Sequence, residues 1–178
     1  RKDTMPLARR GLGAVEPTLA REQGLALPMK PEHQEALLEV LYEGHCGLMP
    51  RESLSGMLLV QRVRDALMTA ALERHASQRP LDAPVVLIAG SGHTRRDYAV
   101  PALLERRGRT SASVTFATPS ATGDPAPSAM PYDYVVFTPS PEREDPCLRL
   151  REQQRHPVGL RGTPVPSDPR EPARAPAR

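Results

Sequence analysis

One short apolar run, "PVVLIAG" at residues 84–90, constrains the fold more than any other feature of the sequence. It has the length of a strand, and a proline and a glycine bound it. A continuous apolar run of this kind is typical of a strand buried on both faces, which occurs almost only in α/β sheets covered by helices. We therefore expect residues 85–89 to form such a buried strand.

Helices and strands alternate along the rest of the chain. The pattern predicts helices over residues 31–42 and 53–76, a weaker helical segment over about 4–23, and a short helix over "VPALLERRG". Two further strands are expected in "SASVTFAT" and "YDYVVFTP". This alternation predicts an α/β fold with a mostly parallel sheet flanked by helices.

The predicted sheet is incomplete on its N-terminal side. Two long helices precede the first of only three strands, which make a thin sheet for so many helical residues. We therefore expect part of the sheet to be supplied by sequence that this chain lacks. Polar residues and prolines fill the C-terminal region and predict a disordered tail. The predicted domain covers residues 1–149, and the predicted tail covers residues 150–178.

The turn "GSGHTRRDY" after the first strand gathers polar and reactive side chains. In open α/β sheets, ligands bind beyond the carboxyl ends of the strands, where His93 is expected to lie. Its imidazole could bind a metal or hydrogen-bond to a ligand, and Arg95 could pair with carboxylates. Asp97 could orient an arginine or the histidine, while Tyr98 could ligate ferric iron as in haem sites with a tyrosine ligand. The plainer interpretation is a common glycine turn before an exposed helix start, and spacing alone leaves both open.

Two other places carry candidate residues. His45 lies in the loop before the long helix, which must pack on the sheet, so it could approach the same crevice; it could equally be a surface histidine. Gln61, Arg64 and Asp65 follow one another at helical steps with Met68, so they share one strip of the long helix. From spacing alone, an exposed flank with local ion pairs explains this strip as well.

Several classes of function are disfavoured by the composition. The net charge of +3 is scattered, and no basic stripe is interleaved with aromatic residues, so we expect no nucleic-acid binding. Neither a phosphate loop nor a GxSxG elbow is present. The two cysteines form no CxxC pair, which argues against structural zinc and leaves buried thiols or one disulfide. No apolar run reaches the length of a membrane span, and the first residues do not resemble a signal peptide.

The ordered segments "HCGLMP", "QRVRDALMTAAL", "PVVLIAGSGHTRRDYAVP", "YDYVVFTP" and "DPC" resemble the second half of the ChaN family of haem-binding lipoproteins, which are linked to iron uptake. The wider superfamily includes the Tiki and TraB proteins and the erythromycin esterases. The resemblance runs from about residue 1 to Cys147. Its specific parts are the Gln61–Met68 strip and the Gly-x-Gly-His-x-Arg-x-Asp segment.

The resemblance implies an α/β fold that binds haem in the periplasm or cell envelope, a lipid anchor on the membrane, and dimerisation. It favours a binding protein over an enzyme. Tyr98 becomes the candidate axial ligand of the iron, and His93 its partner or a second iron ligand. Arg95 or Arg64 would pair with the propionates. Positions that match the family's motifs, and so become haem-site candidates, are His45, Gln61, Arg64, Asp65, His93, Arg95, Asp97 and Tyr98. Matching family positions also imply a disulfide between Cys46 and Cys147.

The sequence departs from the family pattern in three ways. Ser91 stands where the family usually has Asn, and Ala99 stands where it usually has Gly; both changes are small. The third departure is larger, because nothing here matches the family's first strand with its Gly-Glu-x-His type motif or its lipidated cysteine. The chain therefore resembles an N-terminally truncated member that lacks half of the crevice.

Two alternatives to haem binding stay open at this point. In the first, His93 and His45 with Glu43 or Asp65 would hold a metal that activates water, as in a metal-dependent hydrolase of the wider superfamily. The absent upstream motif argues against a complete centre of this kind. In the second, the chain is an inactive remnant whose unpaired strand promotes aggregation.

Overall fold

The computed structural model describes residues 10–80, 83–119, 126–139 and 145–155. The chain divides into two compact units, Arg1–Arg143 and Glu144–Arg178. The second unit contains helix α6 (Pro146–Arg155). The first contains, in chain order, η1 (Gly11–Ala14), α2 (Pro17–Glu22), α3 (Pro31–Gly44), η2 (Arg51–Leu54), α4 (Ser55–Ser77), η3 (Ser91–His93), α5 (Val100–Arg106), β1 (Val114–Ala117), η4 (Pro127–Ala129) and β2 (Tyr134–Phe137).

The helices begin and end close to where the sequence predicts. Helix α3 starts with a proline and has Glu32 in its first turn, which suits the positive end of the helix dipole. Helix α4 ends with Arg74 and His75 in its last turn, which suits the negative end. The weak segment over residues 4–23 is divided into η1 and α2, while residues 4–9 lie outside the described part.

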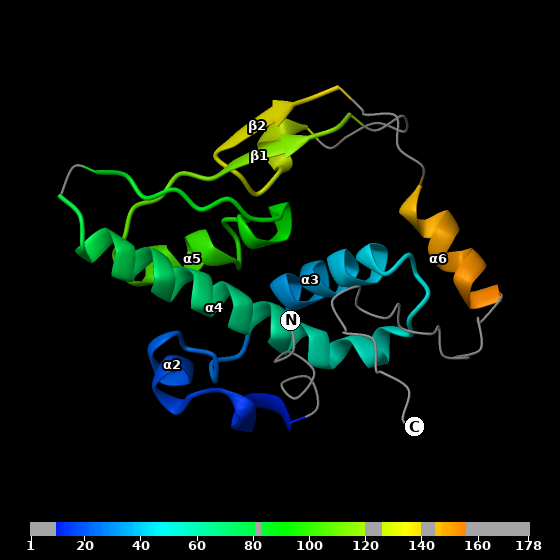
Figure 1. Cartoon of the computed structure of the whole chain (residues 1–178), viewed down its shortest axis with the longest axis horizontal. Helices are drawn as coiled ribbons and strands as arrows, with labels where there is room; N and C mark the ends of the chain where they lie inside the picture. Colours follow the sequence, from blue (N-terminus) through cyan, green and yellow to red (C-terminus); the bar gives the residue numbers. More distant parts are fainter. Residues whose placement is uncertain (1–9, 81–82, 120–125, 140–144, 156–178) are drawn as a thin grey trace, which may run out of the picture. The chain divides into compact units, whose positions relative to one another are not determined.

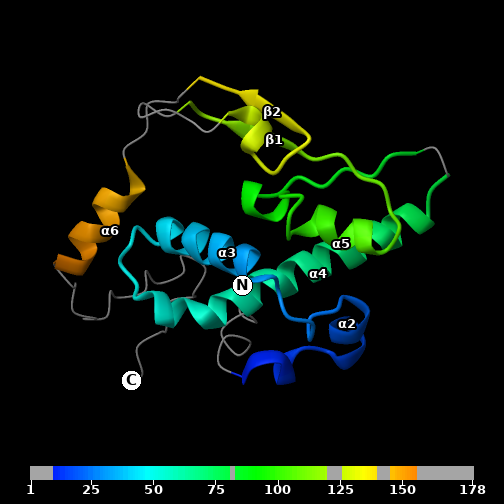
Figure 2. The ribbon, with the colours of Figure 1, turned by 180° about the vertical axis from the view of Figure 1, so that it is seen from behind.

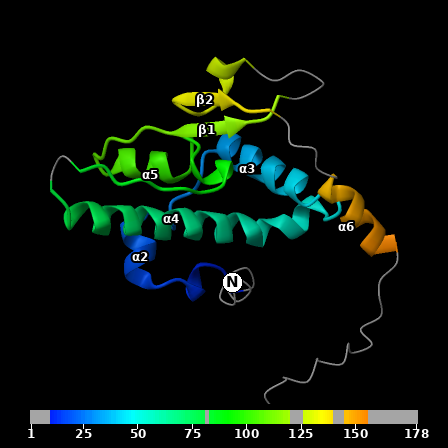
Figure 3. The ribbon, with the colours of Figure 1, turned by 45° about the horizontal axis from the view of Figure 1, so that its top comes forward.

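Helix α4 is the centre of the first unit (Figure 1), and both core clusters pack on it or beside it. Helix α2 lies on one side of α4, while α5 lies on the other, between α4 and the strands (Figures 2 and 3). Arg107, at the end of α5, donates to Glu73 Oε1 of α4 at 2.8 Å and to the Glu22 carbonyl of α2 at 2.6 Å. One guanidinium therefore fastens three helices together.

Two clusters of buried apolar side chains hold this arrangement together. One fills the space between α4 and the N-terminal segment; the other lies under α3 and contains Tyr98. Their buried members are Val15, Leu25, Val60, Val63 and Ala66 in the first cluster, and Leu37, Tyr98 and Ala99 in the second. Because the second cluster includes Tyr98, part of the predicted site also serves as core.

The sheet in the described residues consists of β1 and β2, which pair in parallel. Val114 lies opposite Tyr134, and Phe116 lies opposite Val136. The parallel pairing and the flanking helices confirm the predicted α/β class. All four of these residues are exposed, whereas Thr115 between them is buried. Side chains alternate between the faces of a strand, so one face of the pair is covered and the other is open.

The prediction of a buried strand over residues 85–89 is wrong. The segment is not a strand, and no backbone hydrogen bond in the described residues pairs it with β1 or β2. Val86 is 78% exposed and Ile88 is 94% exposed, whereas their neighbours Val85, Leu87 and Ala89 are half-buried. The alternation of exposed and half-buried residues shows that the apolar run is extended, and that only one of its two faces is packed against the protein. A strand needs a partner, and local sequence does not supply one.

The second unit begins with α6, which runs to Arg155. Residues 150–155, at the start of the predicted tail, are thus helical, because arginine, glutamine and glutamate all favour helix. The rest of the predicted tail, residues 156–178, lies outside the described part. None of the helices described here has the length and apolar character needed to cross a membrane.

Candidate functional site

His93 and Asp65 form a hydrogen-bonded pair between the turn and α4. His93 Nδ1 lies 2.6 Å from Asp65 Oδ1, and Asp65 is only 2% exposed. Gln61, one helical turn before Asp65, places its Nε2 atom 3.0 Å from His93 Nδ1 and 3.3 Å from His93 Nε2. Three residues that the sequence predicted as separate parts of a site therefore meet at one point.

The burial of Asp65 affects its protonation and its hydrogen bond with His93. Removal from water raises the pKa of the Asp65 carboxyl, and the hydrogen bond with His93 opposes that rise. When the carboxylate accepts the Nδ1 proton, the neutral ring keeps Nε2 as its acceptor atom. Gln61 is then the donor next to Nε2. A carboxylate that fixes one nitrogen of an imidazole in this way is the usual support of a metal-binding histidine.

Arg95, Asp97 and Tyr98 form a second group in the same turn. Arg95 donates to both carboxylate oxygens of Asp97, from Nε at 3.1 Å and from Nη2 at 2.6 Å. The guanidinium also lies over the ring of Tyr98, with Cζ at 4.7 Å from the ring centroid. Paired and stacked in this way, Arg95 is held in one orientation.

Tyr98 lies in the core. It is 7% exposed and packs against Leu37 and Ala99, and none of the described residues hydrogen-bonds to its Oη atom. Burial raises the pKa of its phenol to about 12, although Arg95 opposes the rise. A phenolate at this position is therefore strongly disfavoured at neutral pH.

A cavity of about 470 Å³ lies beside β1, and we call it the β1 cavity. It is formed by three segments: the turn after residue 90, strand β1, and the loop before β2. Its lining residues are Ser91, Arg95, Thr115, Phe116, Ala117, Ala129, Met130, Pro131 and Tyr132. Arg96 N–H donates to the Pro131 carbonyl at 2.8 Å, so the turn and the loop are held together at the rim.

Tyr132 is a residue of this cavity that the sequence did not single out. Its Oη donates to the Ser91 carbonyl at 3.2 Å, and burial raises the pKa of its phenol while nearby Arg95 lowers it. The sequence predicts a strand over "YDYVVFTP" that includes Tyr132, but β2 begins at Tyr134. Nothing in the local sequence indicates this role, because Tyr132 approaches Arg95 only through the fold.

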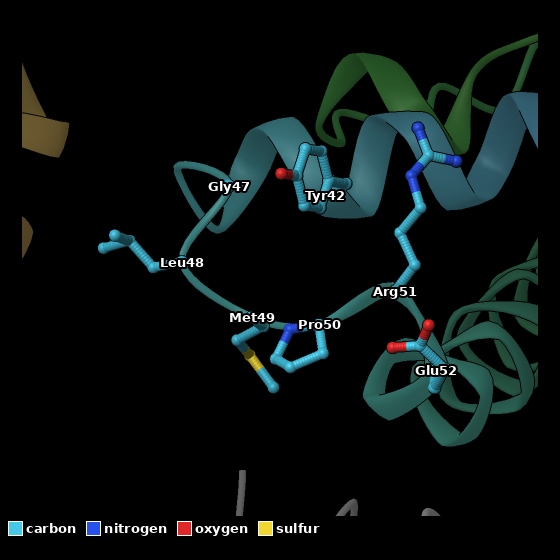
Figure 4. Close-up of a pocket in the computed structure, with 7 residues that line it drawn as sticks. All are labelled: Tyr42, Gly47, Leu48, Met49, Pro50, Arg51 and Glu52. Carbon is cyan, nitrogen blue, oxygen red and sulfur yellow. The ribbon is translucent and has the colours of Figure 1, made fainter.

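His45 and Arg64 are not part of these groups. His45 Nδ1 donates to the Leu41 carbonyl at 2.6 Å and so closes the end of α3. Arg64 is exposed on α4. The loop after His45 contributes to a separate hollow of about 480 Å³ (Figure 4), lined by Tyr42, Gly47, Leu48, Met49, Pro50, Arg51 and Glu52. Arg51 in this hollow pairs with Glu35 and Glu39 of α3.

Cys46 and Cys147 are both disulfide-bonded, and the chain has no other cysteine. The prediction of a disulfide is thereby confirmed. In the described part of the chain, no three side chains of histidine, cysteine, aspartate or glutamate come together in a group that could hold a metal ion.

Comparison with known proteins identifies a family that this chain matches. The sequence model of the family described as "Haem-binding uptake, Tiki superfamily, ChaN" matches residues 1–104, which is more than half of the chain and includes the His93, Asp65 and Gln61 group. No curated protein and no solved structure matches the chain.

Proposed function

The chain belongs to the ChaN family of haem-binding uptake proteins in the Tiki superfamily, and from this premise we propose that it binds haem at the turn 90–98 through His93. The observation that carries the proposal is the pair of His93 and buried Asp65. Haem supplies four of the iron's ligands itself, so the protein needs to provide only one or two. A single oriented imidazole is therefore sufficient, and no cluster of three ligands is required.

The residues of the turn fit this role in specific ways. Asp65 holds the Nδ1 side of His93, so Nε2 is the atom that meets the ligand. Gln61 approaches the same Nε2 atom and must be displaced when the ligand arrives. Tyr98 fits less well, because its hydroxyl is buried in the core. We therefore assign the iron to His93 and leave Tyr98 with a structural role.

A haemin titration followed by absorbance tests the proposal. We expect saturable binding by the wild type and a loss of affinity of about tenfold or more in His93→Ala. Asp65→Asn should weaken binding about tenfold, because a neutral amide is a weaker acceptor for the Nδ1 proton than a carboxylate and makes the imidazole a weaker ligand. His75→Ala is the matched control, because His75 is exposed at the end of α4. Absence of saturable binding by folded wild-type protein would overturn the proposal.

We also propose that the protein works in the cell envelope. The disulfide supports this location, because disulfides persist in oxidising compartments and are rare in the reducing cytosol. Cell fractionation with thiol labelling provides the test. Protein in the envelope fraction should resist labelling until it is reduced, whereas freely labelled protein in the cytosolic fraction would contradict the proposal.

A further inference from the structure

The β1 cavity combines apolar walls with the polar side chains of Ser91, Arg95, Thr115 and Tyr132. Phe116, Ala117, Met130 and Pro131 supply the apolar surface. Two of its polar groups are the charged guanidinium of Arg95 and the hydroxyl of Tyr132, both of which can donate hydrogen bonds. A cavity with mostly apolar walls and a few convergent polar groups is the usual form of a small-molecule site.

Both donors suit a carboxylate. Arg95 has five N–H donors, and Asp97 accepts from two of them, so the guanidinium is oriented before a ligand arrives. Tyr132 donates to the Ser91 carbonyl at 3.2 Å, a long bond for a hydroxyl. A carboxylate in the cavity would offer this hydroxyl a charged and therefore stronger acceptor. Because burial raises the pKa of Tyr132, the phenol keeps its proton and remains a donor.

We propose that the β1 cavity binds the carboxylate-bearing edge of a flat apolar ligand, with Arg95 and Tyr132 as the donors to the carboxylate. The proposal rests on the haem-binding function, and it names which part of the ligand this cavity receives. In haem that part is a propionate. Tyr132 is thus a specificity-determining residue, while His93 is reserved for the iron.

Three porphyrins separate the cavity from the iron site. Haemin has iron and carboxylates, protoporphyrin IX has carboxylates without iron, and haemin dimethyl ester has iron without free carboxylates. Binding is followed by haem absorbance for the two iron porphyrins and by porphyrin fluorescence for the metal-free one. The variants are Arg95→Gln, Tyr132→Phe and His93→Ala, with Tyr134→Phe as control because Tyr134 is exposed on β2.

We expect Arg95→Gln and Tyr132→Phe to weaken haemin and protoporphyrin IX by about tenfold each and to leave the dimethyl ester unchanged. His93→Ala should weaken both iron porphyrins and spare protoporphyrin IX. Arg95→Lys, which keeps the charge, should recover part of the loss, and circular dichroism should show that all variants are folded.

The inference is overturned if haemin binds and neither Arg95→Gln nor Tyr132→Phe changes its affinity. It is also overturned if the dimethyl ester responds to these variants as strongly as haemin does, since the donors would then not act on a carboxylate. If folded wild-type protein binds none of the three porphyrins, the proposed function fails, and this assignment fails with it.

Discussion

At the scale of single residues, the turn uses burial in two different ways. Asp65 is buried and His93 is half-buried, and the hydrogen bond between them replaces one that water would otherwise make with each side chain. Tyr98 is buried with its Oη atom unpartnered among the described residues. A buried hydroxyl without a partner destabilises the fold, and the apolar body of the ring must offset it. The first arrangement suits a working site and the second suits a core position.

Tyr98→Phe should therefore stabilise the protein. The change removes the unpartnered hydroxyl and keeps the ring that packs on Leu37. We expect the free energy of unfolding in urea at pH 8 to rise by about 1 kcal/mol. Haemin affinity should not change, because Tyr98 is not assigned to the iron. A clear fall in stability would show that the hydroxyl has a partner in solution.

The raised pKa of Tyr98 should make the stability of the protein depend on pH in the alkaline range. The pKa of Tyr98 is about 12 in the folded protein, compared with 10.0 ordinarily, so the unfolded chain loses the proton first as pH rises. The free energy of unfolding of the wild type is therefore unaffected by this titration below pH 10. Between pH 10 and 12 it falls by about 3 kcal/mol, because the unfolded chain is ionised while the folded protein still holds the proton. Urea unfolding at pH 8 and pH 11.5 should show the gap between Tyr98→Phe and wild type widening. A constant gap would contradict the raised pKa.

Only part of this site could be predicted from the residues. Helical spacing placed Gln61 and Asp65 on one strip, because spacing in a helix is a local property. Their meeting with His93 depends on how the turn packs on α4, and the resemblance to a family was the only signal for it. Tyr132 gave no signal, because it lies in a loop and approaches Arg95 only in space.

At the scale of elements, helices were predictable and the first strand was not. Helices α3, α4 and α5 satisfy their backbone hydrogen bonds internally, so apolar spacing and terminal prolines or glycines suffice to locate them. The segment 85–89 has the composition of a strand, but its hydrogen bonds need a neighbour that local sequence cannot specify. Its alternating exposure follows from that missing neighbour.

One side chain fixes where the two strands begin. Asp133 Oδ2 accepts from Ser113 N–H at 2.7 Å, and Asp133 Oδ1 pairs with Arg96 at 2.7 Å. Asp133→Ala should lower the free energy of unfolding by about 2 kcal/mol and speed hydrogen exchange at Ser113. Asp133→Asn, which keeps one acceptor oxygen, should lose less. Equal stability of Asp133→Ala and wild type would show that the strands align without this residue.

The packing of α3 on α4 gives a second test at this scale. Leu37 is fully buried beneath Tyr98. Leu37→Ala should lower the free energy of unfolding by about 3 kcal/mol, because it opens a cavity in the core. The exposed Leu67 on α4 provides the control, and Leu67→Ala should change stability by no more than about 0.5 kcal/mol. If Leu37→Ala lowers the free energy of unfolding no more than Leu67→Ala does, the second cluster is not a core.

At the scale of the whole molecule, the first unit leaves apolar surface open. Ile88 and Val86 are exposed on the segment 85–89, and Phe116 is 71% exposed on β1. Apolar side chains left exposed in this way can take part in interactions or promote aggregation. We therefore expect these side chains to promote self-association at high concentration.

Ile88→Lys should reduce self-association and leave the fold intact. The side chain is 94% exposed, so stability should change by no more than about 0.5 kcal/mol. Sedimentation velocity over a range of concentrations measures the effect, with Leu67→Lys as a control on the exposed side of α4. If Ile88→Lys and wild type associate equally, this segment is not the surface through which copies meet.

The positions of the four tyrosines make the protein its own optical reporter. Because the chain has no tryptophan, its near-ultraviolet emission comes from tyrosine. Tyr98 lies in the core, Tyr132 lines the β1 cavity, Tyr134 faces outward, and Tyr42 lies beside Arg51. A porphyrin accepts excitation energy from nearby tyrosines, so a bound porphyrin would reduce the emission of each tyrosine more strongly the closer that tyrosine lies to it. Four single phenylalanine variants would thus locate the ligand without any attached dye.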